Sequence, residues 1–258
     1  MMSWERSITL KTPHEIEIMR EAGKINAEAL AAAKNAIRPG ATTADLDAAA
    51  AEVLRKHGAK AAFLGVPGAF PYPATTTISI NDEMVHGIPS HKRKLVEGDI
   101  VSIDCGTILD GFVADSAISA GVGEISEQAQ RLLEVTEKSL YIGIEQSVPG
   151  NRTGDIGHAI ETYVEGEGYY LTHEYTGHGV GRNMWEGPTV PNYGKPGRGV
   201  PLRTGMTLAI EPMVLIGTER TVILEDHWCV ASADGSLTCH FEHTLAITEA
   251  GPVILTLP

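Results

Sequence analysis

The 258-residue sequence has few basic residues and no strongly basic segment. Lysine and arginine number 20 against 33 aspartates and glutamates, which gives a formal net charge of −13. The longest basic run is the tetrapeptide 91–94. A nucleic-acid-binding protein needs a basic footprint on its surface. The composition therefore excludes nucleic acid as an expected partner.

Cysteines and long apolar runs are also scarce. Only Cys105, Cys229 and Cys239 are present, an odd number without a C-x-x-C spacing, which predicts reduced thiols in a cytosolic protein. No apolar run approaches the roughly 18 residues of a membrane span. Glu5 and Arg6 lie where a signal peptide would need an unbroken apolar stretch. We expect a cytoplasmic protein that does not enter a membrane.

Several catalytic signatures are missing as well. The sequence has no phosphate-binding GxxxxGK[ST] loop, no GxSxG, no SxxK, no HExxH and no EF-hand loop. The segment 177–181 begins like a dinucleotide-binding GxGxxG loop, but Arg182 stands where the third glycine is required. The sequence therefore indicates none of the catalytic or binding sites that these motifs form.

What is present is a regular alternation of helices and strands. With 28 glycines and 14 prolines, the chain has many turn residues. A capping box at Thr12 and Glu15 opens a helix that extends toward Pro39-Gly40. Further helices are predicted over 43–57, 126–146 and 153–165, and strands over 75–80, 100–104, 113–119, 207–215, 221–224, 227–231, 237–248 and 253–257.

The order helix, helix, strands occurs twice, and a short pattern supports a duplication. Segments 39–49 and 149–159 share Pro-Gly-x-x-Thr-x-Asp-aliphatic-x-x-Ala at a constant offset of 110. Pro-Gly before a capping Thr is also a common way to join helices, but the Asp, aliphatic and Ala positions coincide too. We expect one domain over residues 1–258, made of two similar α/β halves, about 12–123 and 126–250, with a cleft between them.

Four acidic residues interrupt apolar strand patterns: Asp104, Asp115, Glu211 and Glu242. A buried carboxylate costs several kcal/mol unless it is paired or bound to a metal, and these segments contain no Lys or Arg. Divalent cations would supply the missing positive charge. Oxygen-rich ligation with an imidazole suits Mn, Fe(II), Co or Zn, and two such ions could activate a water molecule for attack on a carbonyl or phosphoryl centre.

Each acid also has an ordinary structural interpretation. Asp104 could cap a turn, and Asp115 could pair with a distant arginine. Glu211, which precedes Pro212, could face water at a sheet edge, and Glu242 could face solvent from its strand. Four such acids together with a histidine between two glycines favour the metal site.

Three histidines lie in informative surroundings. His178 stands between two glycines, where a bare backbone lets the imidazole approach a crowded centre, although it could also be a loop residue. His86 lies at a strand-to-turn junction, where catalytic groups often occur, although it could be an exposed turn residue. By strand alternation His240 shares the face of Glu242, whereas His243 does not.

The segments that carry these residues resemble the bacterial, type I methionine aminopeptidases. The matching motifs are 79–89, 98–104, 110–115, 177–181, 209–213 and 241–244, and the likeness runs from about Ile8 to the end. It implies an α+β pita-bread fold, with two pseudo-symmetric halves packed around a central antiparallel sheet and helices outside. It also implies a metallo-exopeptidase that removes the N-terminal, initiator methionine from peptides and nascent proteins.

The resemblance implies a role for each candidate ligand. Asp104 binds one metal ion, Asp115 and Glu242 bridge the two ions, and His178 and Glu211 complete the second site. The ions are Co, Mn, Fe(II) or Zn. A hydroxide that bridges them attacks the carbonyl after the first residue of the substrate.

Further roles implied by the resemblance concern the substrate. Glu211 handles the proton, and His86 hydrogen-bonds the scissile amide and assists the leaving nitrogen. Tyr72 and Trp228 belong to an apolar pocket suited to an unbranched thioether. The expected partners are the N-termini of peptides and nascent chains, and the ribosome is a further candidate partner. The expected oligomeric state is a monomer.

The sequence departs from this family at two substrate-binding positions. Trp185 stands where the family has a second histidine that hydrogen-bonds the substrate carbonyl, and Met184 replaces an aromatic pocket residue. An indole donates one hydrogen bond and accepts none. Loss of an oxyanion-type donor typically costs about 10²–10³ in rate.

Two other functions remain open on the residues alone. One is a two-metal exopeptidase of other specificity, similar to X-Pro aminopeptidases, although the extra N-terminal domain usual in those proteins is not expected here. The other is a non-catalytic binding protein on the same fold. The complete set of five candidate ligands argues against the binding protein, which has no need to keep all five.

Overall fold

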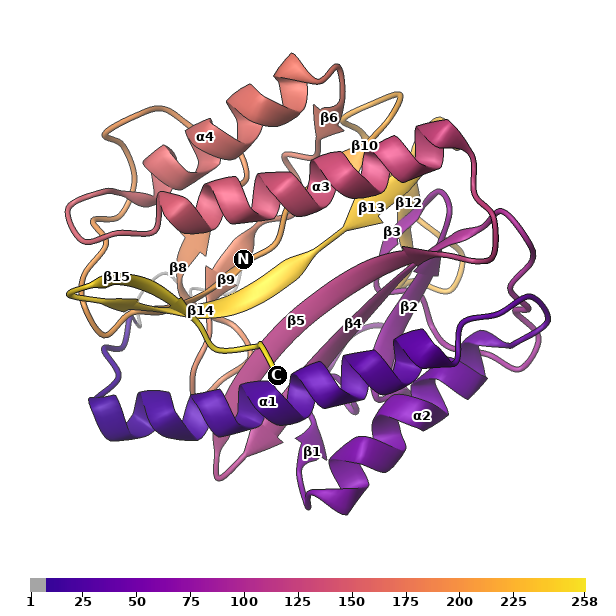
Figure 1. Ribbon diagram of the computed structural model, residues 1–258, viewed down its shortest axis with the longest axis horizontal. Helices are drawn as coiled ribbons and strands as arrows, with labels where there is room; N and C mark the ends of the chain where they lie inside the picture. Colours follow the sequence, from indigo (N-terminus) through magenta and orange to yellow (C-terminus); the bar gives the residue numbers. More distant parts are fainter. Residues whose placement is uncertain (1–7) are drawn as a thin grey trace.

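The described residues contain four α-helices, which form two pairs on the outside of the fold. The computed structural model describes residues 8–258. Glu5 and Arg6, the charged residues that argue against a signal peptide, lie outside the described residues. The helices are α1 (Pro13–Asn35), α2 (Thr43–Lys56), α3 (Glu127–Glu145) and α4 (Thr153–Gly166). In Figure 1, α1 packs beside α2 and α3 beside α4, with strand β14 (Glu242–Thr248) between the two pairs.

The same local device starts α2 and α4. The Asp45 carboxylate accepts a hydrogen bond of 2.8 Å from the backbone N–H of Thr42, and the Asp155 carboxylate accepts one of 2.7 Å from the N–H of Arg152. Both satisfy a backbone donor that a helix start would otherwise leave free. The shared Asp of the two repeated segments therefore has the same physical role in each.

A nine-stranded antiparallel sheet forms the centre of the described fold. Its main order is β1-β4-β5-β14-β9-β7-β8, with β2 paired to β4 and β15 paired to β14. The strands are β1 (Lys60–Ala61), β2 (Thr76–Ile80), β4 (Ile100–Leu109), β5 (Phe112–Gly121), β7 (Gly177–Gly179), β8 (Glu186–Val190), β9 (Thr207–Ile210), β14 and β15 (Gly251–Ile254). The predicted α+β class with a central antiparallel sheet is confirmed.

Two small sheets complete the described strands. One has the order β13-β10-β6 and the other β11-β12-β3. These strands are β3 (Glu83–Val85), β6 (Tyr170–Leu171), β10 (Met213–Leu215), β11 (Thr221–Ile223), β12 (Val230–Ser232) and β13 (Thr238–His240).

Two strands predicted as continuous are broken in the structure. The segment 207–215 divides into β9 and β10 at Glu211-Pro212, and the segment 237–248 divides into β13 and β14 at Phe241. Pro212 has no N–H to continue the ladder. β10, after the first break, and β13, before the second, do not belong to the large sheet, because they pair with each other in a small sheet. The predictions 227–231 and 253–257 were also displaced, since β12 begins at Val230 and β15 covers Gly251–Ile254.

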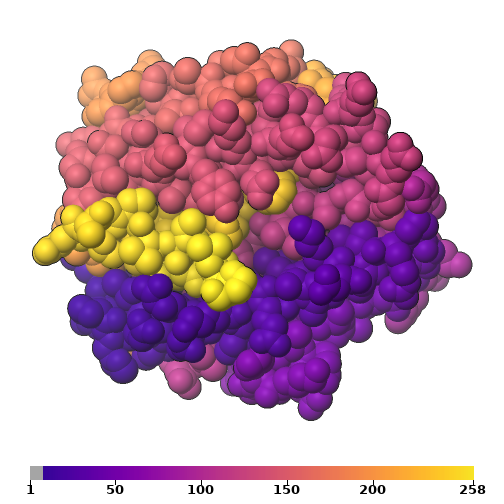
Figure 2. Space-filling model, viewed as in Figure 1, coloured from indigo at the N-terminus to yellow at the C-terminus, as the bar shows by residue number. Residues whose placement is uncertain are grey.

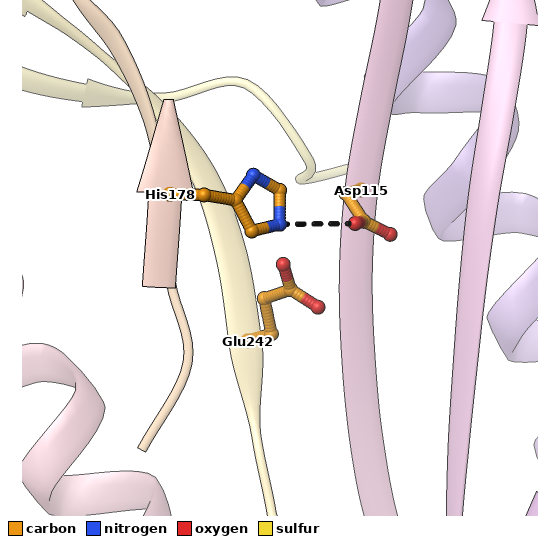
Figure 3. Close-up of side chains that lie close together, drawn as sticks. All are labelled: Asp115, His178 and Glu242. Carbon is orange, nitrogen blue, oxygen red and sulfur yellow. Dashed lines mark ion pairs between the residues drawn. The ribbon is translucent and has the colours of Figure 1, made fainter. Parts of the chain in front are cut away.

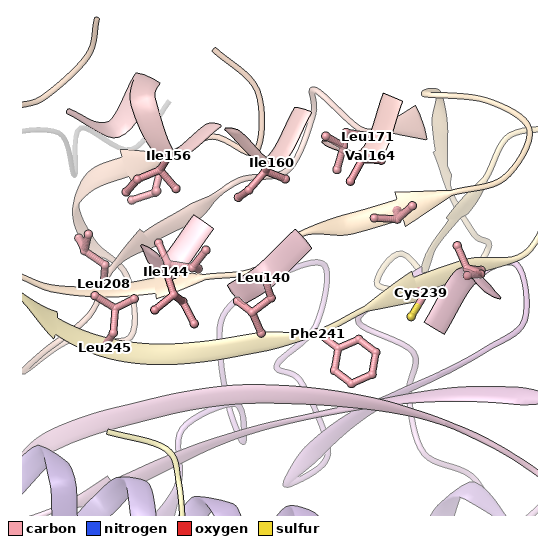
Figure 4. Packing of buried hydrophobic residues seen from close by; sticks show 14 of the residues in the cluster. Leu140, Ile144, Ile156, Ile160, Val164, Leu171, Leu208, Cys239, Phe241 and Leu245 are labelled. Carbon is pink, nitrogen blue, oxygen red and sulfur yellow. The ribbon is translucent and has the colours of Figure 1, made fainter. Parts of the chain in front are cut away.

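The hydrophobic core has a part under each helix pair. Figure 4 shows the larger part, in which Leu140 and Ile144 of α3 and Ile156 and Ile160 of α4 pack on the sheet. A second part lies between α1, α2 and strands β2 and β4. The three cysteines are buried and unpaired, as predicted. None of the described helices combines the length and apolarity that a membrane crossing requires.

The last residues of the chain close the fold against the first helix. Figure 2 shows the C-terminal segment, in yellow, lying against the N-terminal helix α1, in indigo. A Cβ on Gly23 of α1 would collide with the carbonyl group of Leu255, so a glycine is needed at this contact. The N–H of Leu255 also donates to the carbonyl of Thr244 in β14 at 2.8 Å.

Candidate metal centre

Strand register brings three of the candidate acids to one face of the large sheet. Asp104 of β4 is opposite Ala117 of β5, and Glu242 of β14 is opposite the same Ala117. Asp115 is two residues from Ala117 and therefore shares its face. The small side chain of Ala117 thus lies among three carboxylates, where it leaves room for other atoms.

The next strands add His178 and Glu211 to this face. His178 of β7 is opposite Ala209 of β9, which is opposite Thr244 of β14. Thr244 is two residues from Glu242, and Glu211 is two residues from Ala209, so strand alternation points all of these side chains the same way. A Cβ on either neighbour of His178 would strike the backbone of an adjacent strand, which explains the two flanking glycines.

The side chains meet at short distances. The Nε2 atom of His178 lies 3.4 Å from Oε1 of Glu211 and 3.8 Å from Oδ2 of Asp115. One ligand atom each from Asp115, His178 and Glu242 lies within 4.8 Å of the others. Figure 3 shows the three side chains pointing toward one another from their strands. Asp104 lies beside this group on β4, and all five residues line one cavity.

The arrangement leaves polar atoms without partners. Among the described residues, the buried side-chain atoms that lack a hydrogen-bond partner are Asp104 Oδ1, Asp115 Oδ1, Glu242 Oε1 and His240 Nε2. Buried polar atoms are otherwise almost always satisfied. Three orphaned carboxylate oxygens on one face, with no lysine or arginine among the cavity-lining residues, are the donor set of a divalent cation site.

Burial makes all four acids hard to ionise in the metal-free protein, and repulsion between carboxylates adds to this at Asp115, Glu211 and Glu242. Burial raises the pKa of Asp104 to about 7. Burial, followed by neighbouring carboxylates, raises the pKa values of Asp115, Glu211 and Glu242 well above their ordinary range. The alternatives in which these acids face water are wrong, because Glu242 is buried and the Glu211 side chain is only 14% exposed.

The histidines of the site are neutral at physiological pH. Burial lowers the pKa of His178 to about 4, that of His86 to about 4 and that of His240 to about 3. A neutral imidazole is the form that ligates metals. The Nδ1 atom of His178 lies 2.9 Å from the backbone carbonyl of Gly179, and this contact orients the ring so that Nε2 faces the acids.

Two adjoining cavities open at the site. The first has a volume of about 220 Å³ and is lined by the four candidate acids and His178, together with His86, Trp185 and His240. The second has a volume of about 170 Å³ and is mainly apolar. His86, Phe63 and Trp185 line both cavities, so the apolar space lies next to the candidate metal centre.

Aromatic residues shape the apolar cavity. The ring of Tyr72 packs edge-on against Trp228 at 5.1 Å and against Phe63 at 6.4 Å, measured between ring centroids. The Tyr72 hydroxyl donates to the carbonyl of Gly87 at 2.9 Å, so its polar end faces the backbone. Met184 lines neither cavity and is buried against Gly106 instead.

His86 occupies a strained position between the two cavities. Its φ is 62°, in the left-handed region that residues with a side chain seldom adopt. Such strain is kept where the surrounding structure requires it, often at functional sites. The interpretation of His86 as an exposed turn residue is wrong, because the ring faces the cavities and packs edge-on against Tyr175 at 6.1 Å.

Sequence reasoning missed Asn26, which supports β4 and β5 from behind. Its Nδ2 donates to the carbonyls of Cys105 and Ala114, each one residue from a candidate ligand, and its Oδ1 accepts from Ser116. This buried amide fixes the spacing of the two strands that carry Asp104 and Asp115. Its position on the inner face of α1 gave no sign of this role.

A buried ion pair holds the loop that carries Trp185. Lys11 Nζ lies 2.6 Å from Glu186 Oε2, with side chains 4% and 2% exposed. Glu186 also accepts hydrogen bonds from Thr9 Oγ1 at 2.7 Å and from the backbone N–H of Arg182 at 2.8 Å. Residues 9–11 are thereby tied to loop 181–186 at the mouth of the site.

Comparison with known proteins agrees with this geometry. Residues 17–249 match the metallopeptidase family M24. A methionine aminopeptidase of Clostridium acetobutylicum is 50% identical over 250 residues, which cover 97% of this chain and 99% of that protein. The crystal structure of a methionine aminopeptidase from Thermotoga maritima is 46% identical, with a TM-score of 0.95, and the match covers 98% of this chain and 100% of that one.

A more distant likeness concerns the fold alone. A prolidase from Pyrococcus horikoshii superimposes with a TM-score of 0.78 at 24% identity, covering 96% of this chain and 63% of that protein.

The chain belongs to metallopeptidase family M24 and has its pita-bread fold. Its full-length relatives in that family are bacterial methionine aminopeptidases, so the resemblance seen in the sequence motifs is confirmed.

Proposed function

We propose that this protein is a metal-dependent aminopeptidase that removes N-terminal methionine from peptides and nascent chains. The observation that carries the proposal is the convergence of five side chains on one sheet face with three orphaned carboxylate oxygens. The residues that would hold two divalent ions are Asp104, Asp115, His178, Glu211 and Glu242. Bound ions would polarise the scissile carbonyl and supply a hydroxide nucleophile at neutral pH.

Two further residues would act on the substrate itself. His86, neutral and in a strained position beside the metal centre, would hydrogen-bond the scissile amide and assist departure of the nitrogen. The Glu211 carboxylate, whose pKa burial raises, would receive the proton released during attack. Both groups line the cavity in which the scissile bond would lie.

The apolar cavity supports selectivity for methionine. Its aromatic walls, Phe63, Tyr72 and Trp228, enclose a space of about 170 Å³ next to the metal centre. An unbranched thioether fits such a space and makes favourable contacts with aromatic rings. We propose that the enzyme uses Co, Mn, Fe(II) or Zn and acts as a cytoplasmic monomer on free peptide and nascent-chain N-termini, with the ribosome as a further candidate partner.

The direct test is cleavage of a Met-Ala-X peptide by chelator-treated protein reloaded with Mn, Fe(II) or Co. We expect release of free methionine that depends on the added metal, measured by chromatography. A panel that varies the first two residues, with X-Pro peptides included, measures the specificity. Absence of methionine release with every metal would overturn the proposal, and preferential X-Pro cleavage would replace it with the related exopeptidase activity.

Trp185 gives a second test of substrate contact. Its side chain is 42% exposed, lines both cavities and packs edge-on against His178 at 6.5 Å. Because an imidazole can accept as well as donate a hydrogen bond, we expect Trp185→His to keep or raise kcat/KM for Met-Ala-X, with about 10²–10³-fold as the upper bound. Trp185→Phe is the matched control without a hydrogen-bonding group. A large fall in Trp185→His would instead show that the indole has a substrate role of its own.

A further inference from the structure

His240 is a cavity residue to which the proposed chemistry gives no task. Its side chain is 2% exposed, and it lines the same cavity as the candidate ligands. Its backbone is held on both sides, because Ser119 Oγ donates to its carbonyl at 2.7 Å and accepts from its N–H at 3.3 Å. These two hydrogen bonds fix the backbone position from which the His240 imidazole extends.

The ring nitrogen of His240 faces a single carboxylate. Its Nε2 has no hydrogen-bond partner although it is buried. Among residues 8–258, Glu211 is the acidic residue with an oxygen within 4 Å of this nitrogen, Oε2 at 3.8 Å. Buried polar atoms almost always have a partner, and a neutral imidazole that carries its proton on Nε2 can donate it to this carboxylate oxygen.

The Glu211 carboxylate lies between two imidazoles. Its Oε1 is 3.4 Å from His178 Nε2, and its Oε2 is 3.8 Å from His240 Nε2. The two oxygens are thus divided between a candidate metal ligand and a residue outside the ligand set. Glu211 follows β9 immediately before the break at Pro212, so the ladder of the large sheet does not extend past its backbone.

We propose that His240 is a positioning residue for the metal centre. Its Nε2–H donates a hydrogen bond to Oε2 of Glu211 and thereby keeps Oε1 turned toward His178 and the ion that the two residues share. The separation of 3.8 Å is longer than a hydrogen bond of about 2.9 Å, so the contact tightens when the site is loaded. The proposal rests on the proposed function of the site, because it needs a divalent ion there.

The test compares metal affinity in three variants by calorimetric titration of chelator-treated protein with Mn²⁺. Outer partners of metal ligands typically contribute 10–100-fold to affinity. We expect His240→Leu to weaken Mn²⁺ binding by about that factor and His240→Gln, whose amide N–H reaches the same space, to stay within about threefold of the parent. The matched control is His243→Gln, because Nδ1 of His243 lies 2.8 Å from Oγ1 of Thr256 and the residue lines neither of the two cavities at the site.

Two outcomes of the titration must be kept apart. Parent protein that binds no Mn²⁺ would overturn the proposed function, whereas equal Mn²⁺ affinity of parent and His240→Leu would overturn the role of His240. Thermal unfolding of the chelated proteins checks that each variant is folded. If His240→Leu does not fold, His240→Asn, whose shorter amide does not reach Oε2, takes its place with the same expected loss.

A spectroscopic measurement separates positioning from direct ligation. In the Cu²⁺-loaded protein, pulsed electron paramagnetic resonance counts the imidazole nitrogens on the metal. We expect one imidazole, lost in His178→Ala and retained in His240→Leu. Two imidazoles in the parent, or loss of an imidazole signal in His240→Leu, would show that His240 is itself a ligand and would overturn the positioning role.

Discussion

Replacing Glu242 by glutamine is expected to abolish metal-dependent methionine release and, at the same time, to raise the melting temperature of the metal-free protein. Activity is lost because an amide is a poor replacement for a carboxylate that would bridge two cations. Stability is gained because the substitution removes an acid whose pKa is raised by burial and by the neighbouring carboxylates of Glu211 and Asp104, and because Glu242 in turn raises the pKa of Asp115. Asp104→Ala is expected to abolish activity in the same way by removing a ligand.

The pH dependence of unfolding checks the physical reason. The four acids have raised pKa values in the folded, metal-free protein, about 7 for Asp104, against ordinary values of about 4 in the unfolded chain. The folded state therefore holds protons more tightly, and this contribution to stability is complete below pH about 4 and is lost as pH rises through the folded pKa values. Calorimetry of chelated protein should show a melting temperature that falls from pH about 4 to 8.

The same experiment has built-in controls. Glu242→Gln should fall less steeply with pH than the parent, and saturating divalent metal should remove most of the fall in the parent because cations compensate the acids. A chelated Glu242→Gln protein that melts below the parent at pH 8 would contradict the repulsion argument. Retained methionine release in this variant would contradict the ligand role of Glu242.

Replacing Lys11 by methionine is expected to destabilise the protein by about 3–5 kcal/mol, the usual effect of leaving one member of a buried ion pair without its partner. Glu186 would keep its hydrogen bonds from Thr9 and from the backbone N–H of Arg182, but its charge would be uncompensated and buried. Chemical denaturation with metal present measures the change. We also expect a lower kcat/KM, because Glu186 lies next to Trp185 in the loop that the pair secures.

Two comparisons separate burial from charge. Lys24→Met removes an ion pair of the same 2.6 Å length with Glu21, but those side chains are 47% and 51% exposed, so the expected change is below about 1 kcal/mol. The double variant Lys11→Met/Glu186→Gln should recover part of the lost stability, since no unpaired buried charge remains. Equal effects of Lys11→Met and Lys24→Met would show that the buried pair contributes no more than the exposed one.

The candidate ligands could be predicted because burial of an acid without a basic partner is visible in a strand pattern. Asp104 and Asp115 interrupt the apolar sequences of two long strands that are buried along most of their length. Their meeting with Glu242 depends on register around Ala117, which no local pattern encodes. The family resemblance supplied that arrangement before the structure did.

Other features could not be predicted because they depend on breaks and on distant contacts. Alternation of apolar residues continues through Phe241, so the change of sheet between His240 and Glu242 has no local signal. The short strand around His178 is rich in glycine and has no periodicity to detect. Met184 was expected in the substrate pocket from its place in the motif, but the side chain turns into the core beside Gly106.

The contact between Gly23 and Leu255 has a consequence for the biosynthesis of the protein. Helix α1 is among the first elements to leave the ribosome, yet the backbone that packs against Gly23 belongs to Leu255 and Thr256, which are among the last residues made. Strand β14, which carries Glu242, is also made late, and it pairs with the early strand β5. During synthesis, the edge of β5 and the face of α1 at Gly23 therefore stay exposed until the C-terminal residues are made. The candidate metal site, which includes Glu242, can form only when synthesis is nearly complete.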